Sequence, residues 1–105
     1  MNNFFHKDSR LGILVPHLDK EWHEYSIEDQ HAILATWEVI RGYIPDRIKE
    51  LEQTINSKQA ELDKEDNFIR SCQLNSEIAE MASIINDLWI WYRTNQSVLE
   101  EKIHG

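Results

Sequence analysis

The sequence predicts an all-α protein built on a long antiparallel helical hairpin, and three observations support this fold class. From Asp46 to His104 the chain contains neither glycine nor proline. Within that stretch apolar residues recur at spacings of three and four, which places them on one face of a helix. Alternating β-branched residues closed by Asn-Gly or Asp-Gly turns, the usual signal of a β-hairpin, are absent.

The N-terminal segment, residues 1–25, is expected to cover one end of the helical hairpin. A short helix starting at Pro16 fits the preference of proline for the first turn of a helix. The segment carries the apolar residues Phe4, Phe5, Ile13, Leu14, Val15, Leu18 and Trp22. We therefore expect a short helical segment that packs on the rest of the chain.

The first arm of the hairpin is predicted over 27–63. Ser26 is suited to capping the start of this helix, and acids in the first turn face the positive end of its dipole. The apolar stripe of its first half consists of Ile27, Leu34, Trp37 and Ile44, with Ile33 and Ile40 beside them. Because Gly42 and Pro45 both disfavour a straight helix, a kink is expected near 42–45.

The second arm is predicted over 67–104, after a polar turn at 63–67. Both arms show the spacing of a coiled-coil seam with one polar residue admitted in each. The seam positions are Ile48, Leu51, Ile55, Lys58 and Leu62 in the first arm, and Ile78, Met81, Ile85, Leu88, Tyr92, Asn95 and Leu99 in the second. The structural alternative is a three- or four-helix up-down bundle, with helix breaks at Gly42–Pro45 and Asn75–Ser76.

Residues 1–105 are expected to form a single helical domain of elongated shape. An arm of about 38 residues is about 57 Å long at 1.5 Å per residue. A compact chain of this length has a radius of gyration of only about 13 Å. A straight hairpin of this kind cannot be compact.

Aromatic residues gather at the end of the hairpin where the N-terminal segment is expected. The run from Leu88 to Tyr92 is apolar at five consecutive positions, and a helix that is apolar all round is buried on several sides. One partner arm cannot cover it alone, so the N-terminal segment is expected to cover it first and a second copy of the chain next. The candidate interaction residues are Trp37, Trp89, Trp91 and Tyr92, and the expected assembly is a homodimer or a higher oligomer.

Two histidines lie at a spacing from glutamate that is typical of metal ligands. Glu28 and His31, like Glu101 and His104, have the Glu-x-x-His spacing that di-iron carboxylate bundles project inward. Glutamate and histidine are both common on exposed helix faces, so we expect these two pairs to be ordinary surface residues. No metal and no cofactor are expected, although the sequence leaves metal binding by these pairs open.

Catalytic residues are not expected anywhere in the chain. Glu77 and Glu80 resemble half of the carboxylate pattern of all-helical nucleotide pyrophosphohydrolases, but no second pair and no cluster of lysine or arginine accompanies them. Cys72 has no histidine within ten residues and is expected to fill the apolar seam as a small side chain. The chain is therefore expected not to be an enzyme.

The net charge of the chain excludes some classes of binding partner. Nineteen acidic residues against 11 basic ones give a net charge of −8, which argues against direct binding to nucleic acid or to an anionic membrane. No apolar stretch is long enough to span a bilayer, and a cytoplasmic location is expected. The favoured function is a non-catalytic intracellular protein–protein interaction module that self-associates through its helical hairpin. The alternative is a small acidic inhibitor, of the immunity or nucleic-acid-mimicking type, for a basic partner protein.

Overall fold

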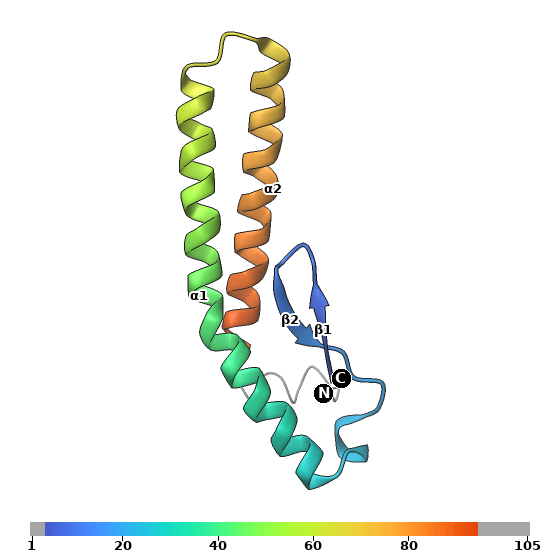
Figure 1. Cartoon of the computed structure of the whole chain (residues 1–105). Helices are drawn as coiled ribbons and strands as arrows, with labels where there is room; N and C mark the ends of the chain where they lie inside the picture. Colours follow the sequence, from blue (N-terminus) through green and yellow to red (C-terminus); the bar gives the residue numbers. More distant parts are fainter. Residues whose placement is uncertain (1–3, 95–105) are drawn as a thin grey trace.

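The computed structural model describes residues 4–94, and a hairpin of two α-helices forms most of it. Helix α1 (Ile27–Asp63) and helix α2 (Phe68–Tyr92) run antiparallel side by side (Figure 1). The predicted helical hairpin is therefore confirmed. Within residues 4–94 these are the two α-helices, so the three- or four-helix bundle is not formed. The molecule measures 59 × 24 × 21 Å, and its radius of gyration of 17.8 Å exceeds the value of about 13 Å for a compact chain of this size.

The start of helix α1 and the bend within it are each explained by a local residue. The Ser26 side chain accepts a hydrogen bond from the Asp29 N–H at 3.0 Å and so caps the first turn. Pro45 lies inside the helix and cannot donate to the carbonyl four residues earlier. Figure 1 shows that α1 bends partway along its length, as proline inside a helix predicts. Its first part then continues past the end of α2.

Helix α2 is continuous through Asn75 and Ser76 and ends at Tyr92, short of the predicted limit of 67–104. Two side chains of α1 donate hydrogen bonds to main-chain carbonyl groups at this end. Arg41 donates to the Tyr92 carbonyl at 2.9 Å, and Trp37 donates to the Thr94 carbonyl at 2.6 Å. These donors satisfy acceptors that a helix end leaves open. The remainder of the predicted arm, residues 95–104, lies outside the described residues.

The predicted N-terminal helical segment is wrong, because a two-stranded antiparallel sheet takes its place. Strand β1 (Phe5–Asp8) pairs with strand β2 (Ile13–Pro16). Asp8 closes the turn, since its side chain accepts from the Leu11 N–H at 2.8 Å and its carbonyl accepts from the Gly12 N–H at 2.7 Å. Gly12 has a φ of 78°, which glycine adopts without the strain that a side chain would add.

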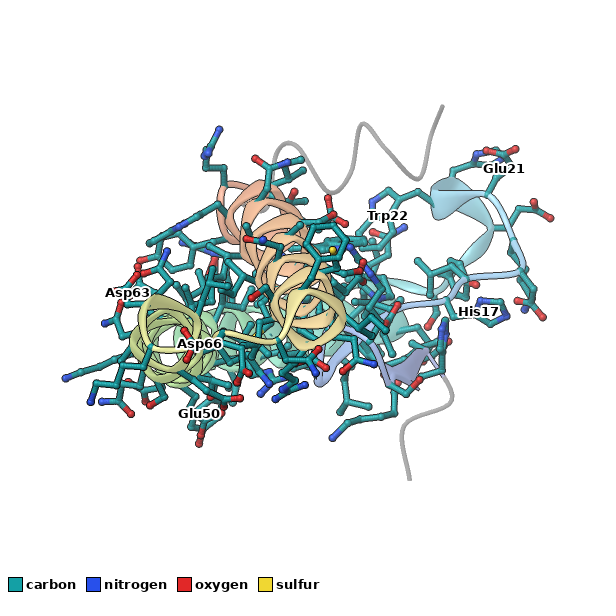
Figure 2. The ribbon with its side chains drawn as sticks, turned by 90° about the horizontal axis from the view of Figure 1, so that it is seen from above. His17, Glu21, Trp22, Glu50, Asp63 and Asp66 are labelled. Atoms are coloured by element: carbon teal, nitrogen blue, oxygen red, sulfur yellow. The ribbon has the colours of Figure 1, made fainter. Side chains whose placement is uncertain are left out.

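A single turn of 3₁₀ helix, η1 (Trp22–Glu24), connects the β-hairpin to α1. Glu21 and Glu24 form a reciprocal capping box around it. The Tyr25 hydroxyl accepts from the Asp19 and Lys20 N–H groups at 3.2 and 3.3 Å, and burial raises the pKa of that hydroxyl. Figure 2, seen from above, shows His17, Glu21 and Trp22 together on one side of the two helices.

The core consists of two clusters, and each contains N-terminal residues. The larger joins β2 and the loop before it to both helices, and comprises Leu11, Ile13, Val15, Trp37, Ile40, Ile44, Ile48, Leu51, Ile84 and Leu88. The smaller consists of Trp22, Tyr25 and Ile33. The N-terminal segment therefore packs against the aromatic end of the helical hairpin, and it does so mainly with strands.

Two arginines hold the turn of the β-hairpin against the helices. The Arg10 guanidinium contacts three residues of α2: Glu80 at 2.9 Å, Asp87 at 2.7 Å and the Ser83 hydroxyl at 2.9 Å. From α1, Arg47 Nε donates to the Leu11 carbonyl at 3.0 Å. The turn is thus fixed from both sides, which determines where β2 lies beside α1.

Candidate protein-binding surface

The four aromatic residues that the sequence singled out form two edge-on pairs. Trp37 and Trp91 lie with their ring centroids 5.4 Å apart, and Trp89 and Tyr92 lie 5.5 Å apart. Trp37 is fully buried. Arg41 lies over the Tyr92 ring, 5.0 Å from its centroid, so that ring also has a cation–π partner.

Trp89 is the most accessible of these four, with 37% of its surface exposed, beside Ile90 at 47%. Trp91 and Tyr92 are half-buried. A role of these residues in binding a partner stays a prediction. What their contacts explain is the packing of the helix end, because aromatic pairs of this geometry stabilise an interior.

A second apolar surface lies between β2 and the first half of α1. Leu14 is 41% exposed, Val39 60% and Tyr43 65%. They border an open groove of about 480 Å³ whose lining also includes Lys7, Gly12, Ile13, Thr36 and Ile40. We call this surface the β2–α1 groove. Lys7 is the one charged residue in its lining, so the groove is apolar over most of its length.

The groove was not predicted from the sequence, although the residues on its α1 side follow a pattern that the sequence shows. Val39 and Tyr43 are four residues apart and share one side of a helix. They lie off the stripe that faces α2, so their exposure could have been inferred from the helical spacing. Leu14, in contrast, joins them only because β2 packs against α1, which depends on contacts distant in the sequence.

Small residues extend this surface around α1. Ala32, Ala35 and Gly42 are all exposed on the helix that carries Val39 and Tyr43. A Cβ atom added at Gly42 would meet nothing within 4 Å. Packing within the chain therefore does not require glycine at this position.

The candidate metal ligands do not converge in the described part of the chain. Glu28 and His31 are both exposed in the first turns of α1. His6 and His17 lie edge-on with ring centroids 4.8 Å apart. Between residues 4 and 94 there is no group of three or more His, Cys, Asp or Glu side chains that could hold a metal ion. Glu101 and His104 lie outside the described residues.

The carboxylates considered for catalysis are in ion pairs with the chain's own cations. Glu77 accepts from Lys58 at 2.8 Å and lies 3.8 Å from Arg70, and Glu80 is bound to Arg10. The hydrogen bond from Lys58, followed by the charge of Arg70, holds the pKa of Glu77 below its ordinary value. These contacts join elements of the fold to one another, which is a structural role.

Cys72 is exposed, so its predicted position in the apolar seam is wrong. The buried positions of α2 are Leu74, Ile84 and Leu88. Cys72 lies on a different side of the helix from these residues, because successive helical residues are rotated by about 100°.

Comparison with models of known protein families, with curated proteins and with solved structures found no match. Within the described residues, no helix is both long enough and apolar enough to cross a membrane. The predicted cytoplasmic location and self-association stay predictions.

Proposed function

We propose that this chain is a non-catalytic protein-binding module and that the β2–α1 groove is its binding surface. The observation that carries the proposal is the exposure of Leu14, Val39 and Tyr43 around one groove. Adjacent large apolar side chains that remain in water on a small domain are typical of a protein-binding site. Covering the exposed part of each would contribute roughly 1 kcal/mol.

The shape of the groove favours a helix as the bound element. Its α1 side presents Val39 and Tyr43 four residues apart, and Lys7 and Leu14 line the β2 side. An amphipathic helix binds in such a groove through apolar residues at spacings of three and four. Tyrosine is also among the residues that contribute most to binding energy at interfaces.

The alternative, an acidic inhibitor of a basic partner, has less support from the charge distribution. Glu61, Glu77, Glu80 and Asp87 are each paired with an arginine or lysine of the same chain. Paired carboxylates attract a basic partner more weakly than free ones. These four carboxylates are therefore less available to a basic partner than unpaired ones.

Site-specific photocrosslinking in the native host tests the proposal. A photoreactive benzoylphenylalanine replaces Tyr43 in the groove, and in a second variant it replaces Gln59, which is exposed farther along α1. A discrete covalent adduct at position 43 that is absent at position 59 is expected. Equal adducts at both positions, or none at either, would contradict a binding site in the groove. The mass of the adduct also reveals whether the partner is another protein or a second copy.

A further inference from the structure

We infer that α2 carries a second contact surface, on which two copies of the chain associate through an antiparallel pair of α2 helices. This surface is separate from the β2–α1 groove and goes beyond the function proposed for that groove. Its residues recur at spacings of three and four, which is the spacing of a coiled-coil seam. They are Phe68, Cys72, Asn75, Ala79, Ala82, Asn86 and Trp89, and all are exposed. We call this row the outer seam.

The outer seam lies on a side of α2 that no other element between residues 4 and 94 covers. Asn75 and Trp89 directly follow the fully buried Leu74 and Leu88, so the outer seam is rotated by about 100° from the seam that faces α1. The β-hairpin reaches α2 on another side, where Arg10 contacts Glu80, Ser83 and Asp87. The outer seam therefore stays exposed along the whole helix.

The outer seam contains no charged residue, although 29% of the chain is charged. The four charged side chains of α2 are each in an ion pair with another part of the same chain: Arg70, Glu77, Glu80 and Asp87. A helix face that stays in water normally carries charged residues. This face instead has large aromatic residues near its two ends, with Phe68 80% exposed and Trp89 37% exposed. Both features indicate a contact with another helix.

A second copy of the chain fits the outer seam layer by layer. A coiled-coil seam alternates between two kinds of position, and in an antiparallel pair each kind faces the other. With the two-fold axis near the middle of α2, Asn75 lies opposite Asn86 of the partner subunit, and Ala79 lies opposite the partner's Ala82. Asparagine amides donate and accept hydrogen bonds, and a paired asparagine in a seam fixes its register. Each layer occurs twice about the axis, so the seam is complementary to its own reverse.

The layers toward the ends are complementary in size and charge. Cys72, which is small, lies opposite Trp89 of the partner subunit. Phe68 lies opposite the partner's Arg93, and a guanidinium group stacks well on an aromatic ring. Arg93 is exposed and makes no ion pair within residues 4–94. Antiparallel packing also brings it close to the partner's loop at 63–66, which has three acidic residues and one lysine. A parallel arrangement would place the two acidic loops side by side.

The middle of the outer seam allows two helix backbones to approach closely, because Ala79 and Ala82 are small. An open groove of about 540 Å³ lies beside Ala82 between the two helices, and its lining is completed by Glu52, Ile55, Asn56 and Ile85. Glu52 is the one charged residue of this lining, and Lys49, about one helical turn earlier on α1, offsets its charge. The centre of the proposed contact is therefore open in shape and nearly neutral.

Substitution of the two asparagines tests the inference. Asn75 and Asn86 are about 16 Å apart along α2, so they cannot reach each other within one chain. Sedimentation equilibrium from micromolar to near-millimolar concentrations measures the dimer dissociation constant of the full chain. Asn75→Lys and Asn86→Glu should each raise it about tenfold, because each places an unpaired charge in two layers of the seam. The double variant places lysine opposite glutamate in both layers and should return the constant to within about threefold of the starting value.

The control is Gln73→Glu, which adds a charge at an exposed position on the opposite side of α2 and should leave the dissociation constant unchanged. Circular dichroism melts establish that each variant folds. If Asn86→Glu does not fold, Ala79→Glu near the axis replaces it and should abolish the dimer, because it places two carboxylates in the centre of the seam.

Two outcomes would overturn the inference: a monomer at every concentration, or a double variant that associates as weakly as the single variants. A monomer that captures a different protein through benzoylphenylalanine at position 79 would also overturn it and would assign the outer seam to that protein. The proposed function fails separately. If the chain dimerises as described and position 43 forms no adduct, the groove is not a binding site and the α2 dimer stands.

Discussion

Trp37 donates its indole hydrogen to the main-chain carbonyl of Thr94 at 2.6 Å, and both residues are buried. This bond joins the first half of α1 to the chain directly after α2. The Thr94 hydroxyl in turn donates to the Ile90 carbonyl at 2.9 Å, so Thr94 is held by both helices. A buried carbonyl of this kind has no solvent to replace a lost donor.

Replacing Trp37 by phenylalanine should therefore lower the free energy of unfolding by about 2–4 kcal/mol. The loss combines an unsatisfied buried carbonyl with the volume that the smaller ring leaves empty. Urea denaturation measures it. Trp89→Phe is the matched control: Trp89 is partly exposed, and the same change there should cost less than about 1 kcal/mol. Equal losses would show that the bond to Thr94 does not stabilise the fold.

Substitution by alanine should change the stability of the fold in opposite directions at Gly12, in the turn of the β-hairpin, and at Gly42, in helix α1. At Gly12 a Cβ would lie 2.7 Å from Arg47 Nε, and the φ of 78° disfavours a side chain. Gly12→Ala should lower the free energy of unfolding by about 1–3 kcal/mol. Gly42 is helical with open space above it, so Gly42→Ala should raise that free energy by about 0.5–1 kcal/mol.

Chemical denaturation of the two glycine variants at one protein concentration measures both changes in the free energy of unfolding. A loss of stability in both would contradict the open environment of Gly42.

The two helices could be predicted from the sequence because their signals are local and repeated. The chain from Asp46 to His104 lacks helix breakers, and the apolar spacing persists over many turns. The β-hairpin could not be predicted in this way. Each strand has only four residues, and Ile13 to Pro16 is apolar throughout, so the alternation of a half-buried strand is hidden. Its stability depends on contacts from Arg10 and Arg47 to distant residues.

The aromatic cluster could be predicted from the sequence and the groove could not, again because only local patterns can be recognised in the sequence. Trp37 and Trp91, which the sequence places at the same end of the hairpin, lie in contact. The groove requires the position of Leu14, and the spacing of residues within one helix carries no information about a strand that packs beside it. The sequence therefore indicated the interior contacts of the helices but not the surface formed between elements.

The ion pair of Glu77 with Lys58 should make stability depend on acidity. The hydrogen bond from Lys58 and the charge of Arg70 lower the pKa of Glu77 in the folded chain below its ordinary value of 4.5. The folded state therefore binds fewer protons at Glu77 than the unfolded state does. The stabilisation is fully present above about pH 4.5 and is lost as pH falls through the lower folded-state pKa.

Thermal melts between pH 3 and pH 7 test this dependence. Glu77→Gln should have a lower Tm than the original chain at pH 7, and the difference should close as pH falls below 4.5. Glu52→Gln, at an exposed position of α1, is the control and should show no difference of this pattern. A constant Tm difference across the range would contradict the assigned role of the carboxylate charge.

Arg10 should determine how firmly the β-hairpin is attached to the helices. An isolated two-stranded sheet is at best marginally stable in water, so this one depends on its contacts with α1 and α2. Arg10→Ala removes the contacts with Glu80, Ser83 and Asp87. The exchange rate of the Gly12 amide hydrogen, which is bonded to the Asp8 carbonyl, should rise roughly twofold to fivefold.

Amide exchange followed by NMR separates this local effect from global unfolding, since amides in the middle of α1 should exchange at unchanged rates. Arg70→Ala is the matched control, because Arg70 also pairs with two carboxylates but lies at the far end of the hairpin. It should leave the exchange of Gly12 unaltered. If Arg10→Ala does the same, the packing of Leu11, Ile13 and Val15 holds the β-hairpin without the arginine.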